Sequence, residues 1–338
     1  MNKKFGIIFN SVFFIVFFIC SSCQKDEIDL KRKENVFNGL TIKMPQGHSE
    51  KELSLSKDDY FKMIDIKGSH LKSTENSMVY SLDLLDSLTS LVLINYPRID
   101  SIYEFDEIRT VFVELTDEQI IENKRTIDSF YNCLISYDLI KEINKSDVNE
   151  YLISQKKSKS KSYYFGYDLN LNEVLFLSLH ARFVNPIKTA TDLAFTYTDV
   201  YFPTMDRGQT VADAYRHAVW NAFICRESAS KCEWVSECQK IAKEYSDAHE
   251  SGATKPEWFT DEQWALDKSM DYHNNSVGRS YFGSIAYSYK KCWFCDRYVK
   301  SASVETVASG VYSYVSSAVY VTSKTEMDNN VSKLVYLK

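Results

Sequence analysis

Two sets of polar side chains recur at the same spacing inside apolar stretches of the C-terminal half of the chain. Each set has members four residues apart, and the two sets are Asp213, His217 and Asn221, and Asp271, Asn275 and Arg279. Residues at this spacing lie one turn apart on a single face of a helix. The sequence therefore predicts two helices that each present a carboxylate, a carboxamide and a basic group along one side.

A third polar segment, Asp247-Ala-His249-Glu250, stands at the expected end of the helix between these two, with Gly252 as a stop signal. If the three helices meet, their polar groups must pair with one another or bind a metal, because unpaired buried polar groups are costly. The candidates for catalysis are His217, His249, Asp213, Glu250 and Asp271. The candidates for substrate binding are Arg216, Trp220, Asn221, Asn274, Asn275 and Arg279.

These residues are compatible with more than one kind of chemistry. Imidazole nitrogen and carboxylate oxygen can ligate a divalent metal such as Zn²⁺, and the metal-ligand candidates are His217, His249 and Asp271. The sequence has no His-Glu-x-x-His motif, so a metal would take its ligands from two or three helices. Without a metal, the same groups could act as general acid and base, with Arg216 or Arg279 stabilising an anion. The remaining interpretation is a buried hydrogen-bond network that only fixes helix packing.

The elements that must position these residues are predicted to be helices. Apolar periodicity predicts long helices over residues 210–227, 233–250 and 269–289, preceded by shorter ones over 169–183 and 187–198. A short strand is expected at residues 333–337. Within this region His180 lies on an apolar stretch and is expected to be a core histidine. The C-terminal part is therefore predicted to be a helical, bundle-like domain in a mainly α protein.

The region before it is expected to be a smaller mixed α/β region. Leucines at helical spacing predict a helix that ends before Pro97, and β-branched and aromatic residues predict a strand at residues 110–115. Thr116 and Gln119 form a capping-box pattern at the start of a further helix. No cluster here indicates chemistry, and His48 and His70 are expected to be surface residues.

The N-terminus resembles the export signal of a bacterial lipoprotein. Lys3 and Lys4 precede an apolar run over residues 5–19 that is short for a membrane-spanning helix, and small residues then lead into Cys23. Cys23 is the expected lipidation site, and multiple acyl chains on it would anchor the protein stably. The charged residues after it, Lys25-Asp-Glu27, resemble the surface-export tag of lipoproteins of the Bacteroidota. We therefore expect a lipid-anchored outer-membrane protein exposed at the cell surface.

Composition predicts the domain boundaries, and the net charge limits the classes of partner. The expected segments are a signal peptide at 1–22, a tether at 23–35, the N-terminal region at 36–153, a Lys/Ser linker at 154–163 and the helical domain at 164–338. The 338 residues carry a net charge of −6, which becomes −8 once cleavage before Cys23 removes Lys3 and Lys4. This acidic balance excludes bulk-charge binding of nucleic acid, and the membrane is reached through the lipid alone.

Five cysteines cluster in the C-terminal third of the chain, and export to an oxidising compartment would allow them to pair. They are Cys225, Cys232, Cys238, Cys292 and Cys295. We expect disulfide bridges between the first three and the last two, with the connectivity open.

The three polar segments together resemble the DUF6973 family, a poorly characterised helical domain of bacterial secreted and cell-surface proteins. The blocks that carry the resemblance are Asp213-Ala-Tyr-Arg-His-Ala-Val-Trp-Asn221, Ala248-His-Glu250 and Met270-Asp-Tyr-His-Asn-Asn-Ser-Val-Gly-Arg279. The resemblance covers about residues 170–338 and implies that the three blocks converge on one pocket. It implies no reaction.

The sequence thus favours a surface lipoprotein with a C-terminal hydrolase-like domain, with or without a metal, acting on a substrate that it does not identify. The alternative is a non-catalytic binding or structural module whose polar network only holds the helices together.

Overall fold

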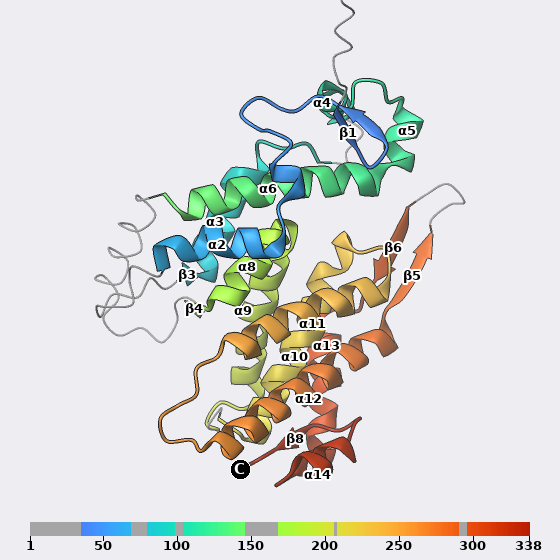
Figure 1. Ribbon diagram of the computed structural model, residues 1–338. Coiled ribbons are helices and arrows are strands. Elements are labelled where there is room, and N and C mark those ends of the chain that lie inside the picture. Colours follow the sequence, from blue (N-terminus) through green and yellow to red (C-terminus); the bar gives the residue numbers. More distant parts are fainter. Residues whose placement is uncertain (1–34, 69–79, 99–103, 146–167, 206–207, 291–295) are drawn as a thin grey trace, which may run out of the picture.

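Helix α10 (Val211–Ser228) lies at the centre of the C-terminal half of the protein (Figure 1). The computed structural model describes residues 35–68, 80–98, 104–145, 168–205, 208–290 and 296–338. From Ala212 to Cys225, only Arg216 is not buried. The helix is enclosed by α9 (Val184–Tyr201), α11 (Val235–Gly252), α12 (Asp261–Ile285) and α13 (Val304–Tyr312). Polar side chains on α10 therefore face neighbouring helices and not open solvent.

The contact between α10 and α12 is very close because Gly278 has no side chain. A Cβ atom at Gly278 would lie 1.9 Å from the carbonyl oxygen of Ala218. The two helices can therefore cross with their backbones nearly in contact, which brings short side chains such as aspartate and asparagine within reach of each other.

The first helix of the C-terminal half, α8 (Leu171–Leu179), begins with a capping box formed by Asn170 and Glu173. The side chain of Asn170 also reaches the end of α11, where it donates to the carbonyl oxygens of Ala248 and His249 at 3.3 and 3.1 Å. This contact fixes the start of α8 against the segment that contains His249 and Glu250.

The N-terminal half lies over one end of this bundle (Figure 1). Its helices are α2 (Lys57–Gly68), α3 (Leu82–Leu93), α4 (Phe105–Val111), α5 (Asp117–Glu122) and α6 (Lys124–Ile143). A short hairpin, β1 (Asn35–Phe37) and β2 (Leu40–Ile42), precedes them. Helices thus predominate in both halves, and the prediction of a mainly α fold is confirmed.

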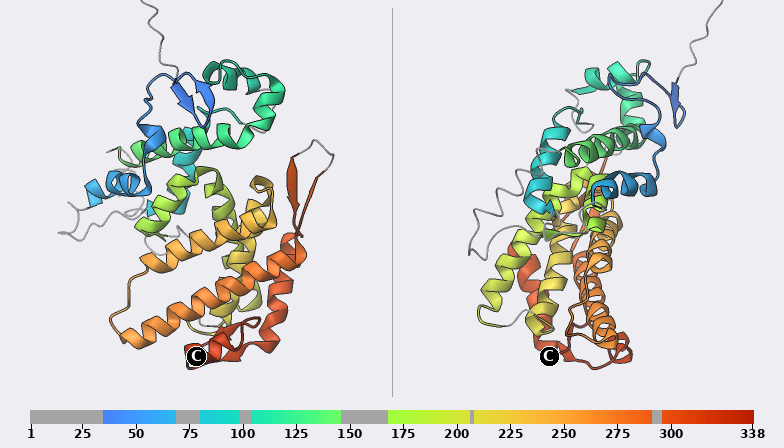
Figure 2. Two further views of the ribbon diagram at one scale, coloured as in Figure 1. Left: turned by 45° about the vertical axis from the view of Figure 1, so that its right-hand side comes forward. Right: turned by 60° about the vertical axis from the view of Figure 1, so that its left-hand side comes forward.

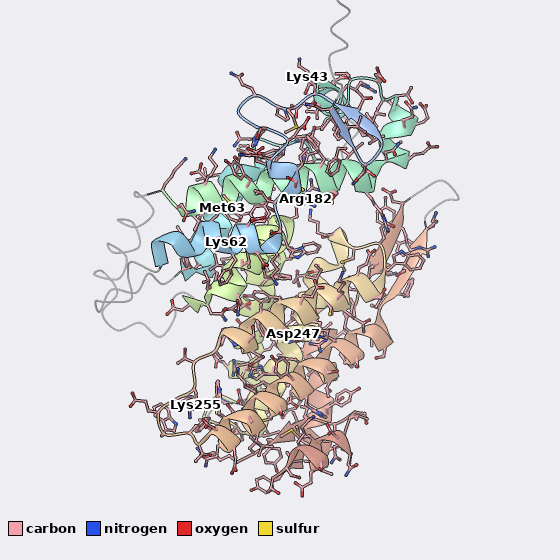
Figure 3. All side chains as sticks on the ribbon, viewed as in Figure 1. Lys43, Lys62, Met63, Arg182, Asp247 and Lys255 are labelled. Atoms are coloured by element: carbon pink, nitrogen blue, oxygen red, sulfur yellow. The ribbon has the colours of Figure 1, made fainter. Side chains whose placement is uncertain are left out.

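The buried hydrophobic side chains of the two halves form one contact cluster, whose first member in the sequence is Ile42 and whose last is Leu334. Strand β3 (Tyr80–Ser81) of the first half pairs antiparallel with β4 (Asp168–Leu169) of the second. Arg182, labelled in Figure 3, forms an ion pair with Asp128 of α6 across the same boundary. The halves are therefore packed as one body.

Two further short strand pairs and several 3₁₀ turns complete the part of the chain that the structure describes. The hairpin β5 (Tyr287–Lys290) and β6 (Arg297–Lys300) projects from the bundle in the left view of Figure 2. At the opposite end β7 (Val319–Tyr320) pairs in parallel with β8 (Val335–Tyr336), beside α14 (Lys324–Asp328). The 3₁₀ turns are Glu52–Ser54, Ala181–Phe183, Ala229–Lys231 and Ser313–Ser317.

Two expectations from the sequence are wrong in the N-terminal half. Residues 110–115 are not a strand, because α4 continues to Val111 and buries Phe105, Ile108 and Val111 on one helical face. His48 is not a surface residue: its side chain is 10% exposed, and its ring lies near those of Tyr96 and Tyr137.

The helix expected over 269–289 begins eight residues earlier. Thr260 and Gln263 form its capping box, and the helix ends at Ile285. Gly252 is the last residue of α11 and does not follow it as a stop signal. The apolar stretch at 169–183 contains α8 and a 3₁₀ turn, and Pro186 lies in the first turn of α9, where its missing N–H has no helical partner to lose.

Several expectations concern residues outside the described part of the chain. They are the signal peptide, Cys23, all of the tether except Asn35, the Lys/Ser linker, His70 and the pair Cys292 and Cys295. No disulfide joins Cys133, Cys225, Cys232 and Cys238 to one another. The bridges to Cys292 and Cys295, which lie outside the described residues, stay a prediction. Among the described residues, no helix combines the length and the apolar character needed to cross a membrane.

Candidate functional site

Asp213 and His217 on α10 and Asp271 on α12 converge at the crossing of the two helices. Each offers one ligand atom, and the three atoms lie within 4.8 Å of one another. Nε2 of His217 is 3.2 Å from Oδ1 of Asp271 and 3.6 Å from Oδ1 of Asp213. The exposed fraction of the side chain is 5% for His217, 13% for Asp271 and 7% for Asp213. One imidazole nitrogen and two carboxylate oxygens thus share a small, nearly dry space.

The imidazole of His217 is neutral in this setting. Burial of the ring, aided by the guanidinium of Arg216, lowers the pKa of His217 to about 3. A metal ligand must be unprotonated, so this shift prepares the ring for a cation. Its other nitrogen, Nδ1, lies 3.8 Å from Oε1 of Glu250, which is beyond hydrogen-bond distance.

The carboxylates of the cluster repel one another. Burial, followed by the negative charges of Glu250 and Asp213, raises the pKa of Asp271 well above its ordinary value. Burial also raises the pKa of Glu250. A divalent cation placed among these oxygens would relieve that repulsion.

Arg216 supplies the positive charge that the described structure places at the cluster. One of its terminal nitrogens contacts Oδ1 of Asp213 and lies 3.2 Å from Nε2 of His217. Burial raises the pKa of Asp213, but the guanidinium of Arg216 and the backbone N–H of Gln209 outweigh burial and hold that pKa below its ordinary value. Two atoms of the cluster, Nδ1 of His217 and Oδ1 of Asp271, are buried and form no hydrogen bond within the described part of the chain.

A hydrogen-bonded layer of amides lies directly behind the cluster. Asn221 donates to Oδ1 of Asn275 at 2.7 Å, and Asn275 donates to Oε1 of Glu250 at 3.3 Å. Arg279 donates to Oδ1 of Asn221 at 2.7 Å and to Oγ of Ser246 at 3.3 Å. The two polar stripes predicted from the spacing therefore face each other, and Glu250 of α11 joins them.

His249 lies beside this cluster but is held by a different partner. Its Nδ1 is 3.0 Å from Oε1 of Glu173, and its ring meets Trp220 edge to face. Burial lowers the pKa of His249, but the hydrogen bond and the charge of Glu173 outweigh it, so the pKa is raised. His249 is thus not one of the three residues whose ligand atoms converge. Asp247, labelled in Figure 3, marks this part of α11.

Asn274 is directed away from the cluster. Its amide donates to the carbonyl oxygen of Val335 at 2.9 Å and its oxygen accepts from the N–H of the same residue at 3.0 Å. Of the two adjacent asparagines, Asn275 therefore belongs to the polar layer, and Asn274 holds β8.

Sequence reasoning missed five residues that support the site: Asn170, Glu173, Gln209, Ser246 and Asp267. Asn170 and Glu173 have the spacing of a capping box, and Ser246 and Asp267 precede Glu250 and Asp271 by one helical turn, so local signals for these four were present. Gln209 had none, because its role depends on contacts with distant residues: its amide donates to Oδ1 of Asp267 at 2.9 Å.

Comparison with known proteins places this site within a recognised domain. No protein with a curated description matches the chain, and neither does any solved structure. One family model does match part of the chain, from within α8 to the first residue of α13. This region includes Asp213, His217, Glu250 and Asp271, and it stops short of residue 338. Residues 174–304 match the model of the family DUF6973, described as a domain of unknown function.

Proposed function

We propose that Asp213, His217 and Asp271 bind a divalent metal and that the surrounding helices form a hydrolase-like domain. The observation that carries this proposal is the convergence of three ligand atoms within 4.8 Å in a buried space. Zn²⁺ is the first ion to test, because catalytic zinc sites combine three nitrogen and oxygen ligands with one open position. Mn²⁺ is the second, because it accepts carboxylate-rich sites.

The metal would supply Lewis acidity toward a substrate oxygen and toward water. The protein's own residues do the rest. Glu250, whose pKa is raised, lies on the Nδ1 side of the His217 ring at 3.8 Å. Asn221, Asn275 and Arg279 hold that carboxylate and the helix crossing in place. Arg216, a quarter exposed, is available to bind an anionic group of the substrate.

A non-catalytic helical module is the competing function. The continuous hydrogen bonds among Asn221, Asn275 and Arg279 favour it, because a network of this kind can specify helix packing alone. The two functions differ at Asp271. A metal site needs its carboxylate as a ligand, whereas a packing network needs no metal ligand there.

The experiment compares metal binding by the unlipidated mature protein and its Asp271→Asn variant. We expect one Zn²⁺ or Mn²⁺ per chain by elemental analysis and titration calorimetry, and a rise in Tm on metal addition. Asp271→Asn should weaken binding more than about tenfold, because it removes a charged ligand while keeping the side-chain shape. Asp247→Asn on the outer side of α11 is the matched control.

Absence of metal binding in the wild-type protein, with the fold verified by circular dichroism, would leave the packing module as the function. If metal binds, metal-loaded and chelated protein are then assayed against phosphodiesters, carboxylic esters and peptides. Hydrolysis that depends on the metal supports the enzyme assignment.

We also propose that the protein is a lipoprotein of the outer membrane, anchored through Cys23 and exposed at the cell surface. The lipobox-like sequence before Cys23 and the charged segment after it support this, as does the resemblance to lipoproteins of the Bacteroidota. The partners are then the membrane, through the acyl chains, and an external substrate.

A further inference from the structure

Cys232 and Cys238 lie at the two ends of the turn that leads into α11. Cys232 directly follows the 3₁₀ turn Ala229–Lys231, and Cys238 lies in the first turn of α11. Five residues separate them in the sequence, and the two residues are 6% and 0% exposed. One short connection between α10 and α11 therefore buries two cysteines.

The backbone of this connection is folded back on itself. The carboxylate of Glu237 accepts the backbone N–H of Glu233 at 2.8 Å. These two glutamates each adjoin one of the cysteines, so the bond holds the neighbours of Cys232 and Cys238 together. From the N-terminal half, a terminal nitrogen of Arg125 lies 2.6 Å from Glu233 and 3.5 Å from Glu237. The two ends of the turn are thus held close by contacts that do not involve sulfur.

The two thiols meet inside this turn. They share a hydrogen bond, and this bond, together with burial, raises the pKa of Cys232. Cys232 also lines a pocket with Lys231 and Lys240, so a small oxidant can approach its sulfur from solvent. Cys238 is fully buried. Cys232 is therefore the thiol that an oxidant meets first, and Cys238 is its nearest partner.

We propose that Cys232 and Cys238 form a disulfide bridge across this turn when the protein meets a disulfide oxidant. With oxidised glutathione, the thiolate of Cys232 attacks one sulfur of the oxidant, a mixed disulfide forms and one glutathione thiolate leaves. The thiolate of Cys238 then attacks the sulfur of Cys232 and displaces the second glutathione. The protein loses two protons and two electrons, and the oxidant becomes two molecules of reduced glutathione.

This pairing differs from the one expected from the sequence, in which Cys292 and Cys295 are the partners of the 225–238 group. The bridge would close the connection between α10, which carries His217, and α11, which carries Glu250. Its presence in the cell depends on the export proposed above, because disulfides persist in oxidising compartments. The ability of the two thiols to pair does not depend on export or on a metal.

The sequence allows a direct test by mass spectrometry. The mature protein is incubated with oxidised glutathione at about pH 8.5, where thiolate is more abundant, alkylated with iodoacetamide and digested with trypsin. Cleavage after Lys231 and Lys240 leaves both cysteines in one peptide, 232–240. We expect this peptide to be unalkylated and lighter by two hydrogen atoms than its reduced form. Further cleavage after Glu233 and Glu237 should leave its two ends joined only through sulfur.

Two results of the mass map would overturn the proposal. One is peptide 232–240 with both cysteines alkylated in a protein whose fold is verified by circular dichroism. The other is peptide 232–240 joined to 217–226, which contains Cys225, or to 292–297, which contains Cys292 and Cys295. Both results come from the wild-type protein, so they do not require a variant to fold.

A thermal measurement with a matched control tests the same bridge independently. Reduction of the oxidised wild-type protein should lower its Tm by at least about 3 °C more than reduction of Cys232→Ala, because a closed loop restricts the unfolded chain. Cys133→Ala removes a thiol elsewhere and should show the full wild-type decrease. An equal decrease in the wild type and Cys232→Ala would contradict the bridge.

Discussion

Arg216 contacts the same two atoms that a metal would use, Oδ1 of Asp213 and Nε2 of His217. A guanidinium carries one positive charge and a divalent ion carries two, so the ion and the side chain compete for one place. A quarter of the Arg216 side chain is exposed, so the side chain could move into solvent if a metal bound. We therefore expect Arg216 to lower the affinity of the proposed site for a metal.

We predict that Arg216→Gln raises the affinity of the protein for Zn²⁺ about tenfold, equivalent to about 1.4 kcal/mol. Removal of the competing charge is the physical reason. Titration calorimetry of the variant against the wild type measures the change, and Lys240→Gln, which removes a charge from the exposed face of α11, serves as control. A weaker affinity in Arg216→Gln would show that the guanidinium supports the site and does not compete with the metal.

His217 should make the metal-free protein sensitive to acid. Its pKa is about 3 in the folded protein and near 6.5 when unfolded, so the unfolded chain binds the proton first as the pH falls. The contribution of His217 to the free energy of unfolding is present above pH 6.5 and decreases by about 2 kcal/mol on going from pH 6.5 to 4.5. Urea unfolding of wild type and His217→Gln at both pH values isolates this contribution. Equal losses in both proteins would contradict the prediction.

Residue types and spacing predicted the two polar stripes but not all of their partners. The i, i+4 pattern of Asp213, His217 and Asn221 defines a helix face without reference to anything else. The pairing of His249 with Glu173 depends on α8 meeting the end of α11, and no spacing within one segment encodes that contact. The members of each polar stripe were therefore predictable from spacing, whereas the pairing of His249 with Glu173 was not.

At the scale of elements, the site depends on how closely α10 and α12 approach. Gly278 faces the carbonyl of Ala218, whereas Gly283, five residues later on α12, faces only the end of the Gln239 side chain. A methyl group at position 278 would have to displace the backbone of α10. A methyl group at position 283 would displace only the end of the Gln239 side chain.

We predict that Gly278→Ala lowers the free energy of unfolding by about 3 kcal/mol, as overpacking of a tight contact does. It should also weaken Zn²⁺ binding, because Asp271 moves away from His217. Gly283→Ala is the matched control and should be nearly neutral, since alanine favours helix. Chemical unfolding and calorimetry measure both effects. Equal stability of the two variants would mean that the helix crossing tolerates separation.

Elements were predicted well where their periodicity was long and poorly where it was short. The long helices α10, α11 and α12 were all expected from their sequences, with errors of several residues at some ends. The run from Thr110 to Leu115 resembled a strand by composition, but α4 buries Phe105, Ile108 and Val111 on one face and ends at Val111. Residues 112–115 follow that helix without forming a strand. Tertiary contacts decided that case.

At the scale of the whole molecule, the continuous core joins the N-terminal half to the half that contains the site. Core residues on both sides of the linker expected at 154–163 pack together, and β3 pairs with β4 across it. The N-terminal half, in which the sequence shows no chemistry, therefore buries α8 and stabilises the helix that carries Glu173.

The proposed position of the molecule in the cell depends on acylation of Cys23. We predict that Cys23→Ala abolishes acylation and moves the protein to a soluble fraction, because no lipid remains to hold it at the membrane. Replacement of Lys25, Asp26 and Glu27 by alanine should keep the lipid but reduce surface exposure, measured by protease treatment of intact cells. Cys133→Ala is the control for the loss of a thiol. Unchanged protease accessibility in the triple variant would refute the role of the charged segment in export.

Gln209 connects parts of the chain that are made at very different times. Its carbonyl oxygen accepts the N–H of Leu337 at 2.9 Å, its N–H donates to Oδ2 of Asp213 at 2.8 Å, and its side chain donates to Asp267. With Asn274 bonded to Val335, the supports of the cluster on both helices include residues near 335–337. A ribosome produces those residues long after α10. If the proposed metal binds, its site is therefore complete only after residues 335–337 have been made, and a nascent chain that lacks them does not yet have all the supports of the cluster.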